Sequence, residues 1–272
     1  MNTLVKVFLL FITYSCLGQS NESTMERKNR VDDLIETYVK NCAEKYNYNF
    51  EMSEWQSCLD EGLKKDSTIA YFWQQKAMPY FKAKKYEVGM RYLNKAVLLD
   101  PKRWQPYRAF IKCIFQKSYN ESILDFQDCI KKWGNQYEMD HTYKFYISLC
   151  HLQLNSFNEA EVLLKEYIDD MLKKNGESWV HPTALFYYGI SLYEQKKYDN
   201  AIIAFDRALT IYKNFSDAKI YKAICMAKLG ISTSEVLKLF KEGKEDAKLG
   251  YSINEDNTLY ETYPYQKKWH EN

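Results

Sequence analysis

Apolar residues fall into short segments with helical spacing. Between residues 198 and 209 they recur at intervals of three and four, with small Ala201 and large Phe205 on one stripe. Residues 185–192 show the same spacing around Gly189, and a short polar turn separates the two segments. This arrangement predicts two amphipathic helices that pack against each other as a hairpin.

The same two-segment unit recurs along the chain. Residues 73–101 repeat it, and a divergent pair at 31–46 and 54–65 precedes them. Five small-residue marks stand 33, 38, 41 and 35 residues apart: Gly89, Ser122, Ala160, Ala201 and Val236. A single helical hairpin cannot bury its apolar stripe alone, so a period of this length predicts stacked hairpins that share a continuous core.

One unit carries a recognisable pattern. Trp73, Ala77, Tyr80 and Pro101 stand at the spacing of W-x2-L-G-x2-Y…A-x3-F…P, although Lys76 departs from it. The chain therefore resembles the tetratricopeptide repeat (TPR) family over about residues 30–249. The resemblance implies an all-α, right-handed TPR-type superhelical solenoid of about five helical hairpins. It also implies a non-enzymatic protein, with the first helix of each hairpin lining a concave surface.

The first residues are typical of an export signal. The apolar run at residues 7–12 is too short to span a bilayer and is followed by small and polar residues. We expect residues 1–18 to be a signal peptide cleaved after Gly18, and the protein to be periplasmic or secreted. Cys16 leaves a second possibility, an outer-membrane lipoprotein, and we expect membrane contact only if Cys16 is lipidated.

Two further segments lie outside the repeats. We expect residues 19–29 to form a flexible, polar N-terminus. Residues 250–272 break the repeat pattern, and Pro264 disfavours helix at Tyr263, so we expect an extended C-terminal tail. Its aromatic residues suggest that it docks on the solenoid. The richness in Lys, Asn and Tyr gives the chain a Bacteroidota-like composition.

Little in the sequence indicates chemistry. A net charge of +2 gives no reason to expect nucleic acid. The four histidines have no metal-ligand spacing, and no nucleophile elbow or phosphate-binding loop is present. Cys150 and His151 are adjacent on a helix and point in different directions, so they make a poor nucleophile–base pair. His151 falls at a packing position of the helix and is expected to be a satisfied core histidine. We predict no enzyme activity, no cofactor, no metal site and no small-molecule substrate.

The cysteines allow two interpretations. Cys42 and Cys58 lie 16 residues apart, as do Cys113 and Cys129, and in a TPR hairpin this interval joins residues that face each other across the two helices. In an oxidising compartment both pairs could form disulfides, with Cys129 and Cys150 as a rival pairing. Alternatively the thiols are free and fill small apolar spaces.

The family geometry predicts where a partner binds. The expected concave lining is aromatic and apolar, with one basic spot at Arg108 and Lys112. The predicted contacts are Tyr71, Gln74, Met78, Phe81, Arg108, Lys112, Phe115, Phe145, Leu149, Leu152, Phe186, Ile190 and Tyr193. An extended or helical peptide would fit such a surface. The alternative is that the chain's own tail, with Tyr260, Tyr263 and Tyr265, fills it.

Two functional interpretations follow. The first is a protein–protein interaction scaffold or adaptor in the bacterial cell envelope, which binds a protein or peptide partner in the concave groove. The alternative is an immunity or inhibitor protein that neutralises a cognate toxin. An enzyme would need a pocket with clustered acids or histidines, and the sequence indicates none.

Overall fold

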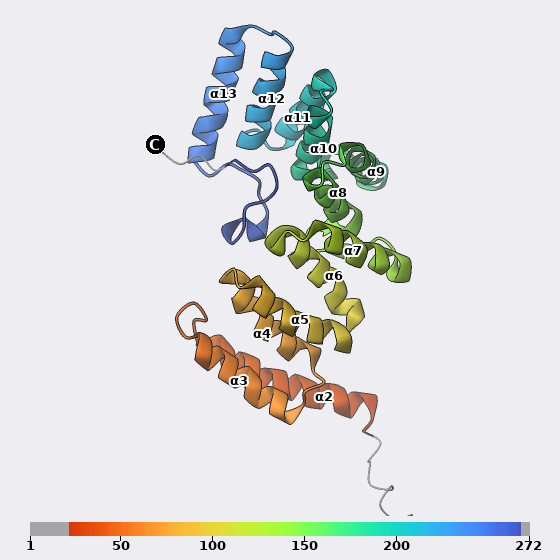
Figure 1. The fold of residues 1–272 in the computed structure, drawn as a ribbon, viewed down its shortest axis with the longest axis vertical. Coiled ribbons are helices and arrows are strands. Elements are labelled where there is room, and N and C mark those ends of the chain that lie inside the picture. Colours follow the sequence, from red (N-terminus) through yellow and green to blue (C-terminus); the bar gives the residue numbers. More distant parts are fainter. Residues whose placement is uncertain (1–21, 268–272) are drawn as a thin grey trace, which may run out of the picture. The chain divides into compact units, whose positions relative to one another are not determined.

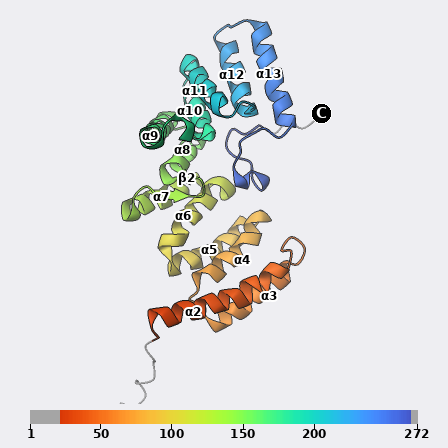
Figure 2. The ribbon, with the colours of Figure 1, turned by 180° about the vertical axis from the view of Figure 1, so that it is seen from behind.

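The computed structural model describes residues 22–267, and these are almost entirely helical (Figures 1 and 2). The α-helices of this part are α2 Thr24–Ile35, α3 Met52–Lys65, α4 Ala70–Lys82, α5 Tyr86–Leu99, α6 Pro101–Ile111, α7 Tyr119–Trp133, α8 Tyr143–Gln153, α9 Phe157–Asn175, α10 Pro182–Glu194, α11 Tyr198–Ile211, α12 Ser216–Lys228 and α13 Thr233–Lys248. They follow one another as six helical pairs, one more than the roughly five expected. Within residues 22–267, no helix is both long and apolar enough to cross a bilayer.

Short elements interrupt the pairs. Two π-helical turns, η1 Glu36–Lys40 and η3 Lys112–Gln116, continue the helices before them. Three 3₁₀ turns are η2 Ala43–Lys45, η4 Glu177–Trp179 and η5 Asp256–Leu259. A two-stranded antiparallel hairpin, β1 Tyr137–Glu138 and β2 His141–Thr142, precedes α8. It lies directly after the loop-like insertion that the sequence shows beyond Trp133.

The chain divides into two compact units, residues 1–72 and 73–272. In the smaller unit, α2 begins at Thr24 behind a capping box formed by Ser23 and Glu26. Helix therefore begins inside the segment 19–29 that we expected to be flexible. The predicted signal peptide and Cys16 lie outside the described residues.

The cysteine pairs have different outcomes. Cys42 and Cys58 form a disulfide, with their Cα atoms 5.8 Å apart. Cys113 and Cys129 are free and buried, so the second expected bridge is not formed, and neither is the rival bridge between Cys129 and Cys150. Cys113 instead faces α8 of the next helical pair. Its Sγ lies 3.5 Å from Cys150 Sγ of α8, and Cys150 is also free.

Small residues allow close helix packing in the larger unit, as the repeat pattern predicted. A Cβ atom on Gly189 of α10 would lie 2.5 Å from Cε1 of Phe205 in α11. A Cβ atom on Gly89 of α5 would lie equally close to Phe81 of α4. Both phenylalanines are buried. Each aromatic ring thus occupies the space that the missing side chain leaves.

The turns inside the hairpins repeat as well. Lys84, Lys117, Asn155 and Lys196 have φ angles of 59°, 62°, 59° and 61°. Each stands two residues before the second helix of its pair, namely α5, α7, α9 or α11. Four successive hairpins therefore share one left-handed turn residue, which makes the structural repeat visible in the backbone.

Candidate functional site: the inner face and its tail

The C-terminal tail, residues 250–267, runs along the face formed by the first helices of the pairs in the larger unit. It leaves α13 at Gly250, whose φ of 85° allows the chain to reverse, and then passes α12, α10, α8 and the loop before α7 (Figures 1 and 2). Its side chains Ile253, Glu255, Glu261 and Tyr263 are buried. The expected concave surface is therefore occupied by the chain's own tail, which was the alternative left open above.

Asp217, the second residue of α12, holds both ends of the tail. Its Oδ2 accepts hydrogen bonds from Ser252 Oγ at 2.7 Å and from the backbone N–H of Ile253 at 3.2 Å. Its Oδ1 accepts one from the backbone N–H of Lys267 at 2.7 Å. Burial raises the pKa of Asp217, and these hydrogen bonds oppose that rise.

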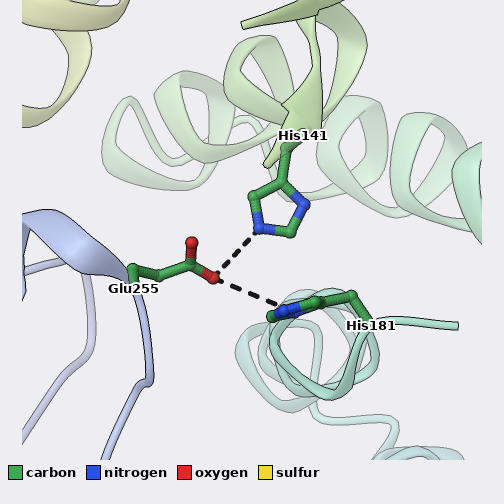
Figure 3. Close-up of side chains that lie close together, drawn as sticks. All are labelled: His141, His181 and Glu255. Carbon is green, nitrogen blue, oxygen red and sulfur yellow. Dashed lines mark hydrogen bonds and ion pairs between the residues drawn. The ribbon is translucent and has the colours of Figure 1, made fainter. Parts of the chain in front are cut away.

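Glu255 lies between two histidines of the helical framework (Figure 3). Its Oε1 is 3.0 Å from His141 Nε2 and 3.8 Å from His181 Nδ1. His141 and Glu255 are buried, and His141 Nδ1 lies 3.3 Å from the hydroxyl of Tyr167. Burial lowers the pKa of His181, and nearby His141 lowers it further. Burial would raise the pKa of Glu255, but the hydrogen bonds with His141 and Thr183 and the charge interactions with both histidines together outweigh it and lower the pKa.

The sequence shows no metal-ligand spacing among the histidines, yet the fold brings two of them together with Glu255. His141 belongs to β2, His181 caps α10, and Glu255 belongs to the tail. Such long separations leave no spacing signal in the sequence. His151, expected to be a satisfied core residue, is half-buried, and its Nδ1 has no hydrogen-bond partner within the described part of the chain.

Glu261 is the second buried acid of the tail. It accepts a hydrogen bond from the hydroxyl of Tyr86 at 2.6 Å and pairs with Lys117 Nζ at 3.1 Å. Burial would raise the pKa of Glu261, but these two donors outweigh it and lower the pKa. Just before it, the ring of Tyr260 lies 4.5 Å from Lys82 Nζ, a cation–π distance.

The segment Tyr263–Pro264–Tyr265 packs against tyrosines of the helices. Tyr187 of α10 donates a 2.9 Å hydrogen bond to the carbonyl oxygen of Pro264, and the rings of Tyr265 and Tyr221 are 6.1 Å apart. A cleft of about 280 Å³ remains beside this segment. It is lined by Cys113, Ile114, Lys117, Tyr119 and Gln153 from the helices and by residues 262–267 from the tail.

Most of the predicted contact residues lie in the helical core. Gln74, Phe81, Phe115, Phe145, Leu149, Leu152, Phe186 and Ile190 are buried, while Tyr71, Met78, Arg108, Lys112 and Tyr193 are partly exposed. The tail meets Tyr187 and the cleft-lining Cys113 instead, each one residue beyond a predicted contact. One residue turns a helix by about 100°, which moves a side chain from the groove into the core.

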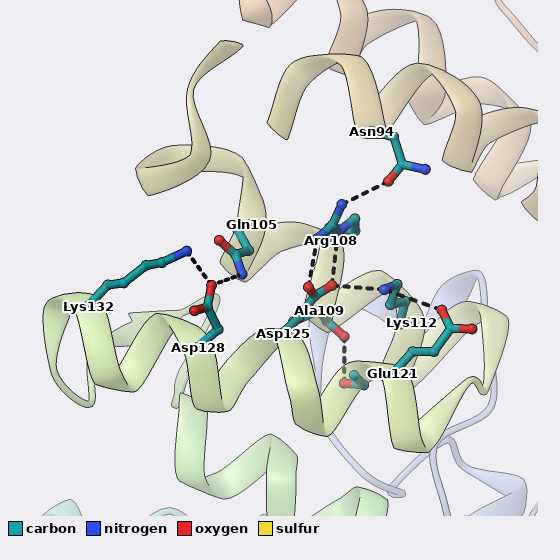
Figure 4. A network of polar contacts seen from close by, with 10 residues as sticks. Asn94, Gln105, Arg108, Ala109, Lys112, Glu121, Asp125, Asp128 and Lys132 are labelled. Carbon is teal, nitrogen blue, oxygen red and sulfur yellow. Dashed lines mark hydrogen bonds and ion pairs between the residues drawn. The ribbon is translucent and has the colours of Figure 1, made fainter. Parts of the chain in front are cut away.

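The expected basic spot is neutralised within the helices (Figure 4). Arg108 makes two hydrogen bonds to Asp125 of α7, at 2.9 and 2.6 Å. Lys112 Nζ lies 2.9 Å from Asp125 and 3.3 Å from Glu121. The two cations therefore hold α6 and η3 to α7, and they do not present an open charge for a partner's carboxylate.

The outer surface carries a second apolar feature. Leu124, Val162 and Ile203 take the same place in α7, α9 and α11, and each is well exposed. Between α7 and α9 lies a cleft of about 540 Å³ lined by Gln127, Ile130, Lys144, Ile147, His151, Asn158, Glu159, Val162 and Leu163.

Comparison with known proteins agrees with this architecture. The tetratricopeptide repeat profile matches residues 182–215, which include α10 and α11. PilW, described as a widely conserved type IV pilus biogenesis factor, is similar at 13% identity and a TM-score of 0.57, over 80% of this chain and 91% of PilW. Pseudomonas aeruginosa PilF is similar at 14% identity and a TM-score of 0.57, over 81% of this chain and 93% of PilF.

A tetratricopeptide repeat protein from Parabacteroides merdae is similar at 12% identity and a TM-score of 0.58, over 86% of this chain and 80% of that one. No curated protein matches the sequence. The stacked hairpins form an all-α helical-repeat fold. Residues 182–215 match the tetratricopeptide repeat profile, and the chain shares its fold with solved tetratricopeptide repeat proteins.

Proposed function

We propose that this scaffold is an adaptor of the bacterial cell envelope, and that its partner binds as an extended segment on the inner face now covered by residues 250–267. The observation that carries the proposal is the tail itself, which is held there as a peptide ligand would be. A partner segment would replace the tail, so the tail sets how readily the face is available.

Several of the contacts recognise the backbone of the tail. Asp217 accepts hydrogen bonds from the backbone N–H groups of Ile253 and Lys267. Tyr187 donates a hydrogen bond to the backbone carbonyl oxygen of Pro264. The N–H of Ser216 donates to the carbonyl of Tyr251. Any extended segment offers the same groups, so this set does not require the tail's own sequence.

Two side-chain subsites add selectivity. One accepts the carboxylate of Glu255 beside His141, and the other accepts that of Glu261 between Tyr86 and Lys117. The two acids stand six residues apart in the sequence, with the 3₁₀ turn η5 between them. We therefore expect a partner segment with two acidic residues at a similar separation and an aromatic residue soon after the second, as at Tyr263.

The envelope role is supported by the N-terminal sequence, which is typical of an exported chain. The fold is shared with PilW and PilF, and the former is described as a pilus biogenesis factor. These likenesses concern the fold, and the partner of this chain is a separate question that a binding experiment answers.

The test keeps the whole chain folded before the tail is freed. A specific protease site is placed at Leu249, which is 73% exposed, and the purified protein is cut there. A labelled synthetic peptide of residues 250–267 should then exchange with the cut tail, as fluorescence anisotropy reports. Envelope proteins captured by the tail-depleted protein should be released by this peptide and retained with a scrambled peptide. A partner that the native peptide fails to release would contradict binding at the inner face.

A further inference from the structure

Three donor atoms converge where the tail crosses β2 and the start of α10. His141, His181 and Glu255 each offer one ligand atom, and these atoms lie within 4.8 Å of one another (Figure 3). They come from three separate segments, two on the helical framework and one on the tail. No other residue of the tail is bracketed by two imidazoles in this way within residues 22–267.

The donor set matches a particular cation. Two imidazole nitrogens with one carboxylate oxygen form a common protein site for Zn²⁺, which binds such ligands at about 2.0–2.2 Å. Around a tetrahedral ion, donors at that distance stand roughly 3.3 Å apart. The observed separations of 3.0 and 3.8 Å from Glu255 Oε1 fall on either side of this value. The two imidazole nitrogens lie within 4.8 Å of each other, so the histidine rings would have to move closer together around the ion.

The surroundings also suit a metal site. The hydroxyl of Tyr167 lies 3.3 Å from His141 Nδ1, which fixes the ring so that Nε2 faces the cluster. His181 Nδ1 accepts a hydrogen bond from the N–H of Thr183 at 3.3 Å, and a cation would compete for the same lone pair. The side chain of His181 is 34% exposed, which leaves one side open for entry and for a fourth ligand.

We propose that His141, His181 and Glu255 bind Zn²⁺, and that the ion fastens the tail to the helical framework. Two ligands are fixed on the framework and the third travels with the tail, so the complete site exists only when the tail is docked. Metal binding and tail docking then favour each other by the same factor. The ion site does not depend on any partner, whereas control of partner access by the ion rests on the proposed function.

The first experiment measures the metal alone. Purified full-length protein, stripped with chelator, is titrated with Zn²⁺ by calorimetry, and Co²⁺ is used for its visible absorption. We expect one ion per chain and the intense spectrum of tetrahedral Co²⁺. His181→Gln and Glu255→Gln should each weaken binding at least tenfold. His151→Gln is a matched control outside both the cluster and the tail contacts, and it should bind as the native chain does.

The second experiment follows the tail. Tyr265 is partly buried against Tyr221 and is followed by Gln266, so chymotrypsin cleaves after Tyr265 only when the tail leaves the face. Zn²⁺ should slow this cleavage at least tenfold in the native chain and leave Glu255→Gln unchanged. Circular dichroism confirms that each variant is folded.

Equal Zn²⁺ affinity in His181→Gln and in the native chain would place the metal elsewhere and overturn the site. Zn²⁺ binding that leaves tail cleavage unaltered would overturn the fastening. Neither measurement needs a partner, so the proposed adaptor function stands or fails separately.

Discussion

The hydroxyl of Tyr187 in α10 donates a hydrogen bond of 2.9 Å to the carbonyl oxygen of Pro264 in the tail. Tyr187 is buried. The bond therefore gives an acceptor to a hydroxyl group that is buried and cannot bond to water. It also fixes the register of the tail at the one residue whose φ is set by its ring.

Tyr187→Phe tests this contact. The substitution keeps the ring and removes the donor, which should cost about 1 kcal/mol of tail docking and speed tail release about fivefold. Hydrogen exchange at residues 263–267 measures the release. Tyr198→Phe, on α11 away from the tail, should leave the exchange unchanged. Equal exchange in Tyr187→Phe and the native chain would show that the bond does not hold the tail.

The docking of the tail should depend on pH through Glu261. Its pKa in the folded chain lies below the ordinary value of 4.5, so docking is favoured above that value and weakens as the pH falls through the lowered pKa. Glu261→Gln should loosen the tail at pH 7, and its difference from the native chain should shrink towards pH 4. Hydrogen exchange at residues 263–267, divided by the intrinsic exchange rate at each pH, measures both effects. A constant difference would exclude ionisation of Glu261 as the cause.

Gly189→Ala should destabilise the larger unit. The added methyl group would lie 2.5 Å from Phe205 Cε1, and the buried ring cannot move freely. Overpacking of this kind costs typically 1–3 kcal/mol. Thermal unfolding should report a lower melting temperature. Asn200→Ala, at an exposed position of α11, should leave the temperature unchanged or raise it slightly.

The disulfide should stabilise the smaller unit. Replacing Cys42 and Cys58 with Ser removes a crosslink that closes a loop of about 16 residues, a change worth about 3 kcal/mol in the chain-entropy account. A reductant should lower the stability of the native chain and leave the double variant unaffected. Replacing Cys129, a free buried thiol, should leave the sensitivity to reductant as it is in the native chain. Limited proteolysis within residues 24–65 measures the change locally.

The sequence identified features that depend on neighbours along the chain. The repeat period located the hairpins, and the small residues marked the close contacts at Gly89 and Gly189. These features can be predicted because helical spacing and side-chain size are both visible in a sequence segment of a few helical turns. The interval of 16 residues likewise pointed to Cys42 and Cys58, which lie within one hairpin.

Features that depend on distant segments escaped the sequence. Glu255 and His141 are 114 residues apart, and nothing near either residue indicates the other. On α10 the more apolar Phe186 was assigned to the groove, whereas Tyr187 meets the tail. The choice between Phe186 and Tyr187 depends on the tail that covers this face. A buried hydroxyl group needs an acceptor, and the tail provides one at this place. Cys113 likewise faces Cys150 across a separation of 37 residues, which no local pattern indicates.

The reversal at Gly250 joins the tail directly to α13, and Asp217 bonds the chain only three residues later, at Ile253. The tail thus remains tethered next to its own site even when the rest of it has lifted away. Over so short a link its effective local concentration is of millimolar order. A free competitor with equal intrinsic affinity would have to reach a comparable level. Exposure of the inner face therefore depends mainly on changes that weaken the contacts of the tail. The concentration of a competing chain has far less effect.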